Sequence, residues 1–96
     1  MITKLNSKIV DLAAIPTQAA NLNNMKTGGI YFISTAENSP DGNNGFLIVM
    51  KGTSNHLKQI WMPYRTPGSN DNHLYIRAAA SGTYAAWTKY DGTIVS

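Results

Sequence analysis

The sequence predicts a mainly β domain: a small antiparallel sheet of about five strands, meander-like and curled, preceded by a short N-terminal helix. Three observations support this prediction. Runs of β-branched and aromatic residues follow residue 28, clusters of Asn, Asp, Gly and Pro separate them, and apolar residues recur at helical spacing before Pro16. We divide the chain into a helix over 1–16, a connector over 17–27 and an antiparallel β domain over 28–96.

The predicted helix has an apolar seam formed by Ile2, Leu5, Ile9 and Leu12, which are spaced three, four and three residues apart. Pro16 ends it, because proline cannot continue a helix. Two heptads do not form a stable helix alone. The seam therefore either docks on its own domain or ends a coiled-coil stalk shared between chains. Isoleucine with leucine in the seam favours two strands in such a stalk.

The rest of the chain alternates between strand-like and turn-like segments. The connector is rich in Asn and Gln and has a possible helical turn at residues 22–25. Sequential strands usually neighbour each other, so the predicted strands should form a meander. They are Gly29–Thr35, Phe46–Lys51, Leu57–Met62, His73–Ala79 and Tyr84–Tyr90, with a turn at Ser81–Gly82 in the last hairpin. Phe46–Lys51 is apolar on both faces, which is typical of a central strand.

The composition excludes several classes of function. Charged residues make up 14% of the 96 residues, and the net charge is only +3, with the basic residues scattered. A nucleic-acid binder would cluster them, so we expect no nucleic-acid partner. The absence of cysteine excludes disulfides and thiolate metal sites. No segment approaches the roughly 20 apolar residues of a membrane span, so we expect no membrane insertion.

An ordered set of short motifs runs from about Leu22 to Tyr90. It begins with LNNM and GIY, continues through an Asn/Pro/Gly-rich loop, FLIVMKG and QIW, and ends with Arg77, Tyr84 and Trp87. This set resembles the knob domains of R-type pyocin fibres and related bacteriophage tail-fibre or receptor-binding proteins. The resemblance implies a structural or receptor-binding domain with no enzyme activity, and commonly a homotrimer. It thus favours a stalk of three strands, against the two that the seam composition favours.

Four residues have a predicted structural role. Arg77 should pack on Trp87 or Tyr84 and bond across the hairpin, because a planar guanidinium can both stack on a ring and donate hydrogen bonds. Gln59, in the adjacent predicted strand, should bridge strand backbones. We favour this structural interpretation over ligand binding.

A second group of residues is the candidate ligand site. Sugars bind through apolar faces stacked on exposed rings, with polar side chains bonding the hydroxyls. The candidate glycan patch combines both kinds of side chain: Trp61, Tyr64, Arg65, Asp71, His73 and Tyr75. The alternative is that Trp61 belongs to the core and the loop is only solvated.

No cofactor, metal site or catalytic group is predicted, because neither histidine has close histidine or cysteine partners and no nucleophile motif is present. With the resemblance, we expect an adhesion domain of a virion fibre, extracellular and bound to other fibre or baseplate proteins. Its ligand would be a host-surface glycan, teichoic acid or another polysaccharide. The alternatives are a purely structural or trimerisation knob, a capsid-surface fibre or decoration domain and, more remotely, a depolymerase.

Overall fold

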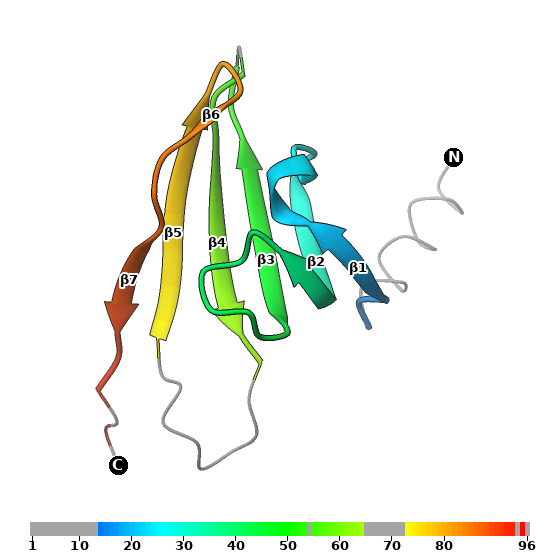
Figure 1. The fold of residues 1–96 in the computed structure, drawn as a ribbon, viewed down its shortest axis with the longest axis vertical. Helices are drawn as coiled ribbons and strands as arrows, with labels where there is room; N and C mark the ends of the chain where they lie inside the picture. The colour runs from blue at the N-terminus through cyan, green and yellow to red at the C-terminus, as the bar shows by residue number, and fades with distance from the viewer. Residues whose placement is uncertain (1–13, 54, 65–72, 94, 96) are drawn as a thin grey trace, which may run out of the picture.

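The computed structural model describes residues 14–53, 55–64, 73–93 and 95. Seven strands form one sheet: β1 (Thr17–Asn21), β2 (Gly29–Glu37), β3 (Gly45–Lys51), β4 (Leu57–Pro63), β5 (His73–Ala80), β6 (Thr83–Tyr84) and β7 (Thr88–Asp91). A 3-10 turn, η1 (Leu22–Asn24), follows β1. The order is β1-β2-β3-β4-β5-β6, and β7 also pairs with β5 (Figure 1). The predicted mainly β, antiparallel-rich fold is confirmed.

The connector contributes more structure than the sequence predicted. Its first half is β1, which pairs in parallel with β2 at the edge of the sheet, with a register shift between Gln18 and Ala19. The possible helical turn is η1, capped by Asn21, whose side chain accepts a hydrogen bond from the Asn23 amide at 2.9 Å. The predicted helix and its apolar seam lie outside the described residues, except for Ala14–Pro16, which are not helical.

The last predicted strand is divided in two. Ser81 and Gly82 both have positive φ, as a type I′ hairpin turn requires, and they join β5 to β6. The chain then leaves the ladder at residues 85–87 before β7 pairs with the first half of β5. The break places Trp87 against β5 and the loop after β2, where its ring nitrogen donates to the Asn38 carbonyl at 3.3 Å.

The hydrophobic core occupies one face of the sheet, which we call the covered face. Its fully buried members are Leu22, Ile33, Leu47 and Trp61, with Val49 nearly so. The side chains of β2, β3 and β4 that point to this face alternate with side chains that point away. η1 supplies Leu22, so the turn in the connector packs on the covered face and shields the core from solvent.

The loop at residues 38–44 is the second cover of this face, and in Figure 1 it crosses in front of β3 and β4. Trp61 fixes it, since the indole nitrogen donates to Asp41 Oδ1 at 3.0 Å. The same oxygen accepts from the Asn43 amide at 3.0 Å. A buried tryptophan therefore both fills the core and anchors the loop above it.

Gly45 is required by the packing of Trp61. A Cβ at this position would lie 2.6 Å from the Met62 carbonyl oxygen and 2.8 Å from the Trp61 ring. Replacing Gly45 with alanine must displace the ring or the strand.

We expect Gly45→Ala to lower the free energy of unfolding in urea by about 1–3 kcal/mol, the usual cost of overpacking. Gly52→Ala is the control, because its Cβ would meet nothing closer than 3.7 Å. Equal unfolding midpoints for the two variants would contradict this account.

Candidate functional site

Gln59 and Arg77 are the buried polar residues among those described, with 0% and 6% of their surface exposed. They lie directly opposite each other on β4 and β5. Arg77 Nε donates to Gln59 Oε1 at 2.8 Å. The Gln59 amide nitrogen donates to the Leu22 carbonyl at 2.7 Å and to the Met25 carbonyl at 3.0 Å. Gln59 thus joins the sheet to the η1 segment, and not to strand backbones as the sequence analysis proposed.

Arg77 stacks on two rings. Its guanidinium carbon lies 4.0 Å from the centre of the Tyr84 ring and 4.3 Å from that of Trp87. The sequence predicted a contact of Arg77 with one of these rings, and both rings participate. Burial lowers the pKa of the Arg77 guanidinium, while Tyr84 acts in the opposite direction. The rings supply the electrostatic attraction that water gives an exposed guanidinium.

Tyr84 adds a second connection to η1, because its hydroxyl donates to the Asn23 carbonyl at 2.9 Å. Together, Gln59 and Tyr84 donate to the carbonyls of Leu22, Asn23 and Met25. The Leu22 carbonyl also accepts from the Met25 amide, which closes the turn. The cluster of Gln59, Arg77, Tyr84 and Trp87 thus binds the connector and the C-terminal strands to one central site. Its contacts are internal, which favours a structural role.

The candidate glycan patch is divided by the sheet. Trp61 is fully buried and offers no ring on which a sugar could stack. His73 and Tyr75 share the covered face at the end where β5 begins, with ring centres 5.4 Å apart. Tyr64 packs instead against Phe32 and Phe46, with ring centres 5.6 and 6.2 Å away. Arg65 and Asp71 lie outside the described residues.

The opposite surface of the sheet, which we call the open face, is also apolar. Ile30, Ile48, Ile60 and Ile76 are paired in register across β2 to β5, so they form a row across four strands that ends at Thr88 of β7. A second row contains Phe32, Phe46 and Met62, and Phe32 stacks on Phe46 with ring centres 4.8 Å apart. η1 and loop 38–44 both bind to the covered face and leave this face uncovered.

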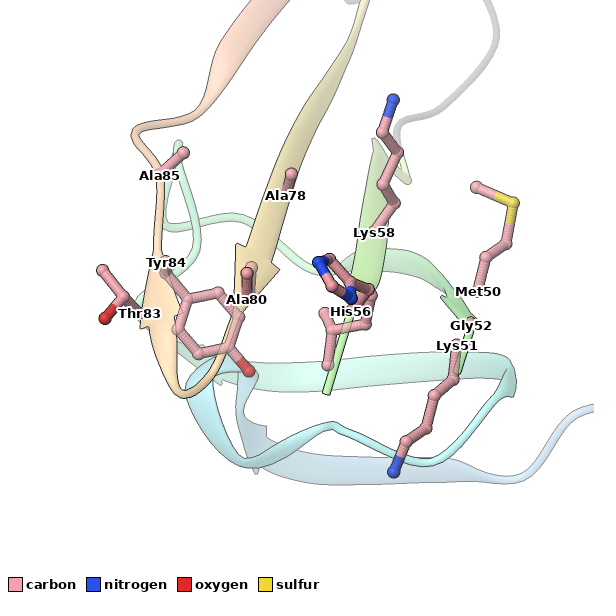
Figure 2. Close-up of a pocket in the computed structure, with 12 residues that line it drawn as sticks. Met50, Lys51, Gly52, His56, Lys58, Ala78, Ala80, Thr83, Tyr84 and Ala85 are labelled. Carbon is pink, nitrogen blue, oxygen red and sulfur yellow. The ribbon is translucent and has the colours of Figure 1, made fainter. Parts of the chain in front are cut away.

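The open face changes in shape along the strands. At the end near Tyr64 it carries the large side chains Phe32, Phe46 and Met62. At the other end, Met50 and Lys58 face Ala78 and Ala80 across a hollow of about 720 Å³. Figure 2 shows the short alanine side chains of β5 at one side of this hollow and those of Met50 and Lys58 at the other.

The sequence pattern did not predict this surface. Phe46–Lys51 was predicted as a central strand because the segment is apolar on both faces, and β3 is central in the sheet. The missed indication was that β2, β4 and β5 also place apolar residues on both faces. An antiparallel sheet with one wet face normally alternates apolar with polar residues.

Other kinds of site have less support. Within residues 14–53, 55–64, 73–93 and 95, no three His, Cys, Asp or Glu side chains gather as metal ligands would. No helix in this part of the chain is long and apolar enough to span a membrane.

Comparison with family models, with curated proteins and with solved structures gave no match.

Replacing Arg77 tests the structural role of the cluster. Arg77→Ala would leave the buried Gln59 Oε1 without its donor and remove the cation between the two rings. We expect a loss of about 2–4 kcal/mol in the free energy of unfolding, measured by urea titration. Arg77→Lys should keep only part of the stability that Arg77→Ala loses, since an ammonium lacks the planar stacking surface.

Lys89→Ala is the matched control for that experiment. Lys89 is another cation of the sheet, but its ion pair with Asp91 at 3.4 Å is exposed. Exposed ion pairs contribute little to stability, so the free energy of unfolding of this variant should lie within about 0.5 kcal/mol of the parent value. If Arg77→Ala kept the parent melting temperature and lost binding to a ligand, the cluster would be a binding site and not a structural one.

Proposed function

We propose that this chain is an adhesion domain of a phage or phage-like tail fibre or receptor-binding protein, located on the virion and outside the cell. The observation that carries the proposal is where the motif residues lie. Leu22, Gln59, Arg77, Tyr84 and Trp87 carry the resemblance to the pyocin-knob pattern, and the first two are distant in sequence from the other three. In the fold, Gln59 bonds to Leu22 and Arg77, and Arg77 stacks on Tyr84 and Trp87.

This arrangement supports the proposal because it makes the motif set a single structural unit. The unit joins η1, β4, β5 and the C-terminal strands, so it accounts for the order and spacing of the motifs. The proposed domain acts by binding and not by catalysis.

The proposed ligand is a host-surface polysaccharide such as teichoic acid. The part of the candidate patch that remains together is the pair His73 and Tyr75, at the end where β5 begins. An aromatic ring beside an imidazole offers a stacking surface and a hydrogen-bonding group. Single sugar contacts of this kind are weak, and several copies on one fibre would add avidity. The homotrimer implied by the resemblance would supply three.

A second candidate is a structural knob that joins fibre subunits and has no ligand of its own, on a tail or on a capsid surface. The open apolar face favours it. Exposed apolar patches of this extent usually mark contact with another macromolecule, and sugars require more polar groups than this face offers.

Binding to whole host cells tests the adhesive role. We expect the labelled domain to bind, and His73→Ala combined with Arg65→Ala and Asp71→Ala to weaken binding by at least about tenfold, or 1.4 kcal/mol. Thr83→Ala, at the opposite end of the sheet, should bind like the parent. Binding that persists in the triple variant would exclude the patch. A domain that binds neither cells nor a glycan array would leave the structural knob as the function.

A further inference from the structure

We propose that the open face is a contact surface for another copy of this chain, in which the large side chains at one end of the face enter the alanine-lined hollow of the neighbour. This inference deepens the structural-knob candidate by naming the partner. It is independent of adhesion, because the residues that it uses differ from His73, Arg65 and Asp71.

The composition of the face requires a partner of similar chemistry. The row of four isoleucines and the row of Phe32, Phe46 and Met62 contain no charged side chain. Ile30 and Met50 are 55% and 47% exposed, and Tyr64 is 54% exposed. The cation on this face, Lys58, lies beside the hollow, at the far end from the aromatic row. An apolar, nearly uncharged sheet face is best covered by an equally apolar one.

The shape of the face fits a second copy in particular. Phe46 and Met50 are four positions apart on β3, so the aromatic row and the hollow are separated by about 13 Å along the strands. A neighbour turned end to end would place its aromatic row over the hollow and receive the first copy's row in return. Such mutual fit is the property that a symmetric interface needs. Because the contact uses the open face of both copies, it is complete with two copies.

The size of the face is sufficient for association. Strands of seven residues span about 23 Å, and β2 to β5 with β7 span roughly 20–24 Å across the sheet. Each copy therefore offers roughly 500 Å², and a pair would bury about 1,000 Å² in total, the lower limit for a specific interface. β-branched side chains dominate the central row, so little rotamer freedom is lost on contact.

The solution mass of the full chain tests the proposal. Light scattering should give twice the chain mass of 10.4 kDa at high concentration. Ile48→Lys places a charge in the middle of the isoleucine row and should return the mass to that of one chain. Thr53→Lys adds the same charge in an exposed turn and should leave the assembly intact. Circular dichroism should be unchanged in both variants, because Ile48 lies outside the buried core.

A single engineered thiol identifies what covers the face. The chain has no cysteine, so Ile60→Cys creates one reporter on the isoleucine row. If another copy covers it, maleimide labelling should slow by about fivefold when the protein is some tenfold more concentrated than its dissociation constant, because about a fifth of the chains are then unpaired. Labelling should become fast on dilution. Thr53→Cys should label fast at every concentration.

Three outcomes would overturn the proposal. A single-chain mass at all concentrations, with fast labelling of Ile60→Cys, would mean that nothing covers the face. Slow labelling independent of concentration would mean that a segment of the same chain covers it. A multimer that survives Ile48→Lys would mean that another contact, such as the predicted seam of Ile2, Leu5, Ile9 and Leu12, holds the copies together.

Discussion

The fold depends on one buried amide. Gln59 has no exposed surface, and its three hydrogen bonds use both amide protons and the carbonyl oxygen. Burying an amide without partners would cost several kcal/mol, so the side chain is tolerable only while η1 and Arg77 both stay in place. This requirement makes three segments that are distant in the sequence depend on one another: residues 22–25, β4 and β5. A polar group in a core that is otherwise apolar selects one arrangement of the connector among many of similar packing.

The two faces of the sheet show how a chain of this size divides its apolar residues. Leu22, Ile33, Leu47, Val49 and Trp61 form a core that, among the described residues, is covered by η1, the loop at residues 38–44 and Trp87. The isoleucine row on the other side is as apolar as that core, yet the described residues provide no second layer for it. Small domains bury a modest fraction of their surface, and many reach adequate stability by association. The distribution of side chains is therefore that of half a two-layer structure.

The sequence predicted those parts of the fold that depend on local pattern. The strands from Gly29 to Ala80 lie within two residues of their predicted bounds, and Ser81–Gly82 forms the expected turn. The contact of Arg77 with Tyr84 and Trp87 was predictable because a cation and two rings occupy paired segments. The parallel pairing of β1 with β2 was not predictable. The segment TQAAN has weak strand propensity, and tertiary packing determines which strand it pairs with. The division of the glycan patch was also unpredictable, because it depends on the strand register, which places Trp61 and Tyr75 on the covered face and Tyr64 beside Phe32 on the other.

The edges of the sheet have a consequence of their own. β1 has five residues and carries a register irregularity, while β6 and β7 together cover the far side of β5 as two fragments of two and four residues. Short or interrupted margins of this kind offer few free backbone groups in line, so they discourage strands of other molecules from adding on laterally. The sheet thus has exposed apolar side chains on its open face, but its edge strands are poor templates for further strand pairing. The proposed pairing through the open face would end at two copies, and these edges would oppose further growth into fibrils.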